Sequence, residues 1–173
     1  KQSSHNLISD EYNINDEKKD LKYGNDIDLE KINTMKSLEQ YLLSKNIISD
    51  FNIPFYSGSE KADLMVIGDK PEDLNKKNPF QGKVETLLDA MLKAISFDKT
   101  NTYFTNLYFT TLSQSSKLFL DIIKKQIIIV KPKVIIMFGA EVTKILSNTE
   151  DSIFHSRGKW YDIYIGDNVE SVT

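Results

Sequence analysis

The stretch Ala62–Gly82 constrains the fold more than any other part of this 173-residue chain. Its apolar run Leu64–Ile67 is too short for a helix, so it predicts a strand that is buried on both faces. The pair Gly68-Asp69 then opens a polar loop that closes at Pro79-Phe80-Gln81-Gly82. Apolar residues at helical spacing predict a helix over residues 83–96. This order places the loop at the carboxyl end of a strand, where open α/β sheets bind ligands.

The same alternation of short apolar runs and helical periods continues along the chain. Tyr103–Asn106 and Val134–Phe138 predict two more strands, and residues 118–130 and 140–147 predict the helices that follow them. An amphipathic pattern predicts another helix at 27–45, before the first strand. We therefore expect an α/β fold, a three-layer α/β/α sandwich with a mainly parallel central sheet.

Three segments are less regular. Residues 47–60 predict a connection that delivers the chain to the first strand. Tyr108 and Phe109 look exposed in a loop after the second strand. Residues 160–165 alternate in the manner of an edge strand that ends at a turn over residues 166–168.

Length and composition predict one domain with an extension. Residues 1–26 are polar and lack a sustained apolar period, so we expect a flexible N-terminal extension before a single domain over 27–173. Residues 1–30 hold four lysines and eight acids, which leaves 18 basic and 17 acidic groups in the rest. This balance neither favours nor excludes nucleic acid as a partner.

The chain has no cysteine, which excludes disulfides, thiolate metal sites and iron-sulfur clusters within it. We expect no cofactor and no metal site. No apolar run approaches the roughly 20 residues that span a bilayer, so the expected location is the cytoplasm, without a membrane partner.

Under the predicted topology, the carboxyl ends of the strands bring Asp69, Phe80, Asn106 and Gly139 to one edge of the sheet. A carboxylate, an aromatic ring and a carboxamide suit a planar ligand that forms hydrogen bonds, such as a nucleobase. The Asn106 amide offers a donor beside an acceptor, which matches the edge of uracil but not that of cytosine. Asp69 could orient water and offset the positive charge that grows on a sugar as its base departs.

Each of these residues also has a structural interpretation. An aspartate after a strand is more often a helix cap, a phenylalanine after proline is more often a loop anchor, and an asparagine at a strand end is more often a turn residue.

Taken together and in this order, the motifs resemble the uracil-DNA glycosylase superfamily, and most closely its family-four branch. The resemblance rests on Gly68-Asp69-Lys70-Pro71-Glu72, Pro79-Phe80-Gln81-Gly82 and Tyr103-Phe104-Thr105-Asn106, followed by Lys131–Ala140 and Arg157–Trp160. It implies a base-excision-repair hydrolase that flips uracil out of DNA and cleaves the N-glycosidic bond by water attack.

Residue by residue, the resemblance implies that Asp69 is the catalytic, water-organising acid. It implies a substrate-binding set in which Phe80 stacks on uracil and Asn106 reads the base edge, completed by Gly68, Lys70, Pro71 and Gln81. The implied partner is uracil-containing DNA, single- or double-stranded, and we expect a monomer.

Three features depart from the family pattern. Glu72 replaces the turn glycine, the cluster-binding cysteines are absent, and the family's His-Pro-Ser loop has no counterpart before the chain ends at Thr173. We therefore expect a C-terminally truncated domain, and we interpret His155 as a surface residue. Two alternatives stay open: a non-catalytic nucleobase-binding or nucleic-acid-binding domain that retains the uracil pocket, and an α/β domain that acts on another small nucleotide.

Overall fold

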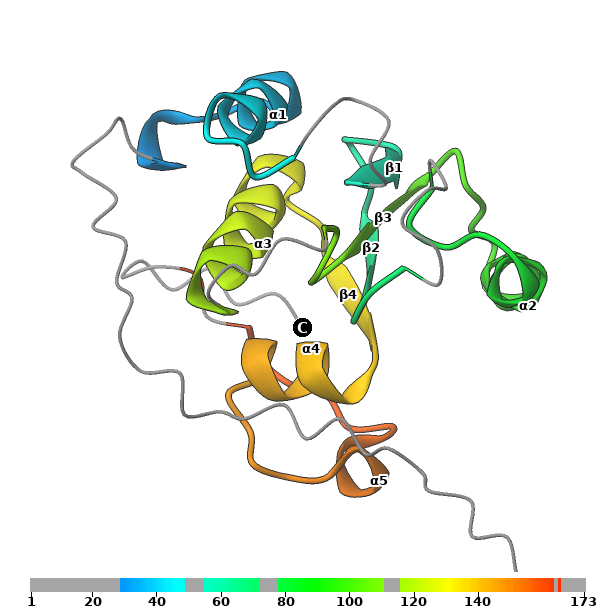
Figure 1. Ribbon diagram of the computed structural model, residues 1–173. Helices are drawn as coiled ribbons and strands as arrows, with labels where there is room; N and C mark the ends of the chain where they lie inside the picture. The colour runs from blue at the N-terminus through cyan, green and yellow to red at the C-terminus, as the bar shows by residue number, and fades with distance from the viewer. Residues whose placement is uncertain (1–28, 49–54, 72–77, 111–115, 164, 166–173) are drawn as a thin grey trace, which may run out of the picture.

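The computed structural model describes residues 29–48, 55–71, 78–110, 116–163 and 165. Four strands form one sheet in the order β1-β3-β2-β4 (Figure 1). Their bounds are Tyr56–Gly58 (β1), Leu64–Gly68 (β2), Thr102–Asn106 (β3) and Val134–Phe138 (β4). β2 pairs in parallel with both β3 and β4, whereas β1 runs antiparallel to β3. The predicted α/β fold with a mainly parallel sheet is thereby confirmed.

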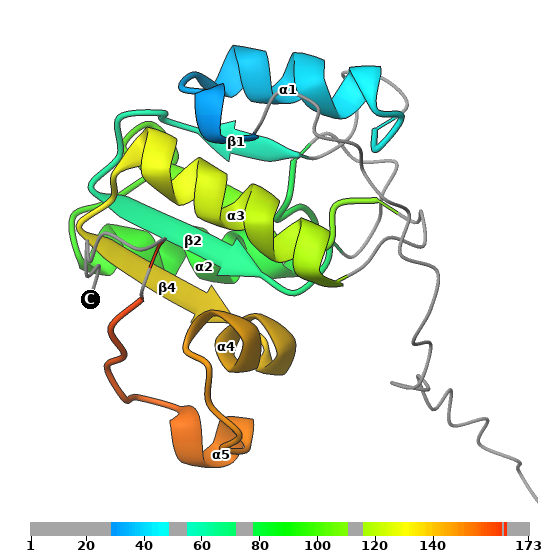
Figure 2. The same cartoon turned by 90° about the vertical axis from the view of Figure 1, so that its left-hand side faces the viewer.

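Helices flank both faces of this sheet (Figures 1 and 2). Their bounds are Leu29–Lys31 (a 3-10 turn, η1), Met35–Ser44 (α1), Lys83–Ala94 (α2), Ser116–Val130 (α3), Ala140–Leu146 (α4) and Ile153–Ser156 (α5). α1 and α3 lie on one side of the sheet and α2 lies on the other.

Side chains of β2 point alternately to the two faces of the sheet, and each face packs against one of these helical layers. Met65 and Ile67 belong to the large core that includes α1 and α3, whereas Leu64 and Val66 belong to a smaller cluster beneath α2. Successive side chains of a strand point to opposite faces, so a short run that is apolar throughout must be covered on both sides. All five residues of β2 are buried, as the sequence predicts for a central strand.

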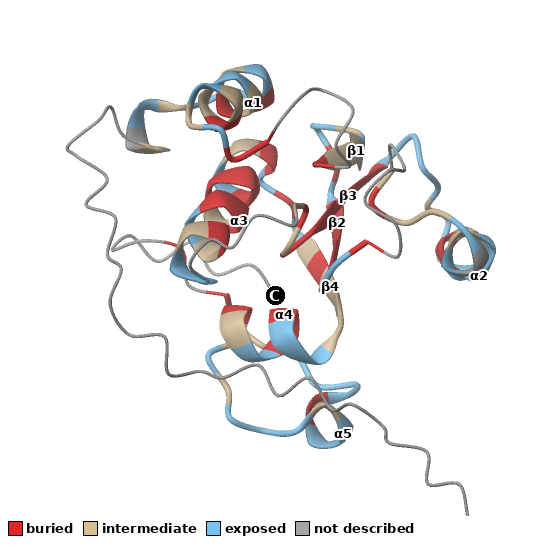
Figure 3. Cartoon of the chain, in the orientation of Figure 1, coloured by how far each residue is buried: buried red, intermediate tan, exposed pale blue. Residues whose placement is uncertain are grey.

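α2 carries more apolar surface than the sheet covers. Of the apolar residues at helical spacing, only Leu88 and Leu92 are buried, because the cluster beneath them is small. Figure 3 accordingly shows α2 as mostly exposed. The other apolar residues of the pattern are 46–64% exposed: Val84, Leu87, Met91 and Ile95.

The predicted helix at 27–45 is wrong in its first part. The chain makes the short turn η1 and then begins α1 only after Thr34, whose side chain accepts a hydrogen bond from the Ser37 N–H at 3.2 Å. Threonine in an extended conformation satisfies one of the free N–H groups that open a helix, so it ends the preceding turn and starts a new element.

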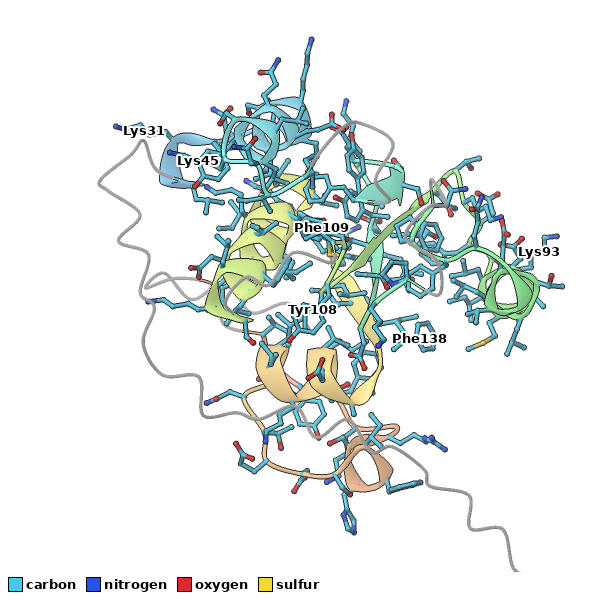
Figure 4. All side chains as sticks on the ribbon, in the orientation of Figure 1. Lys31, Lys45, Lys93, Tyr108, Phe109 and Phe138 are labelled. Carbon is cyan, nitrogen blue, oxygen red and sulfur yellow. The ribbon has the colours of Figure 1, made fainter. Side chains whose placement is uncertain are left out.

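The connection predicted over residues 47–60 contains β1, which the sequence did not reveal because it is only three residues long. The predicted exposure of Phe109 is also wrong. Phe109 is fully buried, 5.0 Å from the Phe55 ring centroid and 5.4 Å from that of Phe119, and Tyr108 is half-buried beside Phe119 (Figure 4). The large core therefore extends over the loop after β3.

The edge strand predicted over residues 160–165 is wrong for the described part of that segment. Only an isolated bridge at Ile163 is present, although Ile163 and Ile165 are buried in the alternating manner that suggested a strand. The short helix α5 precedes this segment and was not predicted.

Two further expectations, the extension over 1–26 and the turn over 166–168, lie outside the described residues. Among the helices that the structure describes, none has the length and apolarity needed to cross a membrane.

Candidate functional site

The carboxyl ends of β2 and β3 lie side by side. Gly68, the last residue of β2, is in register with Asn106 on β3 and with Phe138 on β4. Beyond the strands, the Leu107 N–H donates to the Gly68 carbonyl at 2.8 Å, and the Tyr108 N–H donates to the Asp69 carbonyl at 2.9 Å. These bonds extend the ladder past the sheet and hold the loop after β2 against the loop after β3.

Asn106 is buried at this edge of the sheet and 1% exposed. Its Nδ2 donates a hydrogen bond to the Pro79 carbonyl at 3.0 Å, which ties the end of β3 to the loop that carries Phe80. An amide nitrogen carries two hydrogens, so one remains for another acceptor. The Pro79 contact therefore fixes the orientation of the amide without using its full bonding capacity.

Gly68 allows the close approach of Asn106 and Phe80. A Cβ at Gly68 would overlap Asn106 Oδ1 and would lie 2.9 Å from Phe80 Cζ, closer than real Cβ contacts allow. The carboxamide and the aromatic ring thus both approach a backbone position that has no side chain.

Phe80 is half-buried and also anchors the loop. Its ring makes edge contacts with Phe104, at a centroid distance of 6.1 Å, and with Phe138, at 6.5 Å. Phe138 points toward the α2 side of the sheet in Figure 4. The ring therefore belongs to the smaller core cluster while it also reaches Gly68 at the edge of the sheet.

Asp69 caps the N-terminus of α4. Its Oδ1 accepts a hydrogen bond from the Val142 N–H at 2.7 Å, and its Oδ2 accepts a longer one from the Glu141 N–H at 3.5 Å. The N-cap residue Gly139 supplies no side-chain cap of its own, so the carboxylate of Asp69 takes that place from a different part of the chain. The helix-cap interpretation of Asp69 therefore describes a real contact.

Gly139 makes this contact possible. Its φ of 143° is unfavourable for other residues, and a Cβ there would overlap all three atoms of the Asp69 carboxylate. The sequence placed Gly139 at this edge of the sheet but did not reveal its packing against Asp69, nor the role of Val142. A glycine before a helix without a capping side chain was the available signal.

The remaining predicted substrate-binding residues lie between β2 and α2. Lys70 is exposed, Pro71 is buried and Gln81 is half-buried. Glu72, which replaces the family's glycine, lies outside the described residues. His155 is exposed on α5, where its Nδ1 lies 3.0 Å from Ser152 Oγ.

A cavity of about 220 Å³ lies beside Phe80, between β1, β3 and α2. It shares Phe80 with the site but is not lined by Gly68, Asp69 or Asn106; its lining is Ser57, Gly58, Asn78, Phe80, Glu85, Leu88, Asp89, Lys99 and Phe104. Among the lining residues, a hydrogen bond to the Glu85 carboxylate raises the pKa of Lys99. The volume is below the ~300–1,000 Å³ of typical small-molecule pockets, so the cavity alone does not identify a ligand site.

A family model for the Uracil DNA glycosylase superfamily matches residues 55–170, which is more than half of the chain. The chain belongs to the uracil-DNA glycosylase superfamily. The matched range begins at β1 and includes the strand ends that carry Asp69, Asn106 and Gly139. The superfamily consists in general of DNA glycosylases, so membership indicates a uracil-DNA glycosylase-like function with DNA as the partner.

Proposed function

We propose that this protein is a uracil-DNA glycosylase of base excision repair, similar to the family-four branch, which hydrolyses the N-glycosidic bond of deoxyuridine. The observation that carries the proposal is the close approach of both Asn106 and Phe80 to Gly68, at the carboxyl ends of parallel strands. A carboxamide and an aromatic ring are the two groups that a uracil pocket needs, and here both are held by other contacts before any ligand binds.

In this proposal, Asn106 reads the base. Its Oδ1 accepts from N3–H of uracil, and the Nδ2 hydrogen that Pro79 does not use donates to O4. Cytosine presents a donor where uracil presents O4, so it would leave buried polar groups unpaired. Phe80 stacks on the flipped base. Gly68, at the end of β2, and Lys70, Pro71 and Gln81, between β2 and α2, complete the site around it.

Asp69 acts on the sugar side of the bond in this mechanism. Two backbone N–H groups of α4 hold its carboxylate in one orientation, and each oxygen keeps a lone pair with which to orient water. The negative charge then opposes the positive charge that develops on the deoxyribose as uracil leaves. α4 therefore supplies the rigid support that a preorganised catalytic group requires.

The hydrogen bond from the Val142 N–H to Asp69 also favours a second candidate function, a non-catalytic domain that binds uracil-containing DNA. Capping α4 is a sufficient structural reason for an acidic residue at position 69, and it requires no chemistry.

Excision from a labelled single-stranded oligonucleotide with one uracil separates the two functions. Alkali cleavage reports abasic sites, and Asp69→Asn is the control because it keeps an acceptor for the Val142 N–H but removes the charge. We expect product from the wild-type protein and a decrease of at least about tenfold in the variant. Binding without product would favour the non-catalytic domain, and the absence of both would contradict the proposal.

A further inference from the structure

Two large aromatic side chains project from α5 and the turn that follows it. Phe154 is 80% exposed and Trp160 is 73% exposed, although both are bulky and apolar. Three cationic or titratable side chains alternate with them along the chain, and His155, Arg157 and Lys159 are all exposed as well. We call residues 154, 155, 157, 159 and 160 the α5 patch.

The backbone beneath the α5 patch is held in place by its own contacts. The N–H groups of Ser156 and Arg157 bond to the carbonyls of Ser152 and Ile153 at 3.0 Å, and the Lys159 N–H bonds to the Ser156 carbonyl at 3.1 Å. Ser156 is buried, as is Ile163 beyond the turn. The exposed rings therefore stand on an ordered support.

The cations of the α5 patch are only partly neutralised. Lys159 Nζ lies 3.2 Å from Asp151 Oδ2, whereas Arg157 makes no ion pair within the residues that the structure describes. Instead the Arg157 guanidinium lies 6.0 Å from the centroid of the Phe154 ring. A guanidinium over an aromatic ring forms a cation–π pair, and both planes can stack on a further flat group.

We propose that the α5 patch binds unstacked nucleotides of single-stranded DNA. Aromatic rings and a guanidinium plane stack on bases of any sequence, and interleaved cations contact the phosphates between them. Aromatic residues and arginine are also enriched in protein–protein interfaces, but lysine is depleted there, so Lys159 beside Trp160 favours DNA over a protein partner. This inference rests on the proposed function for the identity of the partner as DNA.

The position of the α5 patch fits this role. α5 packs beside α4, whose first N–H groups hold Asp69 (Figures 1 and 2). In this proposal, a DNA strand that enters the site at the carboxyl end of β2 continues past α4 to α5. The patch would hold nucleotides that flank the flipped one, without taking part in the chemistry.

Stacking rather than charge must supply most of this binding. Residues 140–162 hold three lysines or arginines against four acids, so the region has no strong positive field. Affinity should therefore depend only weakly on salt, with a slope of about −0.7 per phosphate contacted and one or two such contacts.

Trp160 is the only tryptophan of the chain, so its fluorescence reports on the α5 patch directly. The experiment titrates the whole chain with uracil-free oligothymidylate and follows tryptophan emission. We expect saturable quenching as a thymine stacks on the indole, and weaker binding of the corresponding duplex, whose bases are already stacked. Because no uracil is present, the result is independent of whether the protein excises uracil.

The affinity of variants for a labelled oligonucleotide, measured by fluorescence anisotropy, shows which residues of the α5 patch contact DNA. Phe154→Ala and Trp160→Ala should each weaken binding by about 5- to 150-fold, which is the loss of one stacked base. Arg157→Lys should weaken binding without changing the salt slope, because it keeps the charge but removes the plane. Leu87→Ala, which truncates another exposed apolar residue, on α2, is the control and should bind as the wild type does.

Three results would overturn the proposal. These are absent quenching, variants of Phe154 and Trp160 that bind as tightly as Leu87→Ala, and duplex binding that equals single-strand binding. Sedimentation velocity tests a competing occupant, because self-association that Phe154→Ala abolishes would assign the α5 patch to a second copy of the chain instead.

Discussion

The residues at the carboxyl end of β2 are held by atoms that are distant in sequence. Asp69 bonds to Val142, Asn106 bonds to Pro79, and Gly139 leaves the space that the Asp69 carboxylate occupies. Each contact is both structural and available to function, so the two interpretations of a residue do not exclude each other. A variant that tests function must therefore be compared with a control substitution that introduces similar backbone strain elsewhere.

Gly139→Ala should move Asp69. The new Cβ would overlap the carboxylate, and alanine at a φ of 143° carries a strain of about 1–3 kcal/mol. We expect a loss of stability in urea unfolding and a decrease in uracil excision that appears in kcat more than in KM. Gly158→Ala is the matched control for stability, since Gly158 also has a positive φ but no atom within 4 Å of its Cβ. Equal losses of stability, together with unchanged excision by Gly139→Ala, would show that Asp69 does not depend on Gly139.

Asn106→Asp should weaken the preference for uracil over cytosine. The substitution removes the Nδ2 donor, so it abolishes both the bond to Pro79 and the proposed donation to O4. Relative binding or excision of matched oligonucleotides that contain uracil or cytosine measures the effect, and a thermal melt confirms that the variant folds. Unchanged discrimination in a folded variant would remove Asn106 from the base pocket.

Among the secondary-structure elements, α2 shows that a helical spacing of apolar residues does not predict which of them are buried. Its apolar residues all recur at helical spacing, but the sheet face beneath it accommodates only Leu88 and Leu92. Neighbouring leucines on one helix should therefore differ in what they contribute to stability.

Leu88→Ala and Leu87→Ala test this difference. Leu88 is 5% exposed, so its truncation should reduce the free energy of unfolding by about 2–5 kcal/mol. Leu87 is 64% exposed, and its truncation should change that free energy by no more than about 0.5 kcal/mol. Urea denaturation at equilibrium measures both, and similar losses would mean that α2 packs on a different face in solution.

For the whole molecule, the sheet order determines which segments have the highest free energy of local opening. β2 has a parallel neighbour on each side and a helical layer on each face, whereas α5 is only four residues long and two of these residues are exposed. Local opening free energies range from near zero at frayed segments up to the global value in core strands.

Native-state hydrogen exchange should rank the segments accordingly. We expect the amides of Met65–Ile67 and Tyr103–Thr105 to exchange only through global unfolding, and those of α5 to exchange through local opening. The dependence of each rate on low concentrations of urea distinguishes the two routes. Exchange of β2 and α5 with the same urea dependence would contradict the expectation.

The sequence alone determined the layers and the edge of the sheet at which the candidate site lies. Short apolar runs that alternate with helical periods can bury both faces only as central strands of a parallel sheet, and parallel strands bring their carboxyl ends together. Asp69, Asn106 and Gly139 follow such runs directly, so their common edge was predictable from local pattern.

Only the tertiary structure decided what those residues touch. Strand β1 is too short to show a period, and it forms because β3 offers a free edge. Phe109 is buried because Phe55 and Phe119, both distant in sequence, surround it. Asp69 meets Val142 because two separate strands end side by side. Local pattern records which faces of an element are apolar, whereas the area that covers each face and the partner of each polar atom depend on contacts across the whole chain.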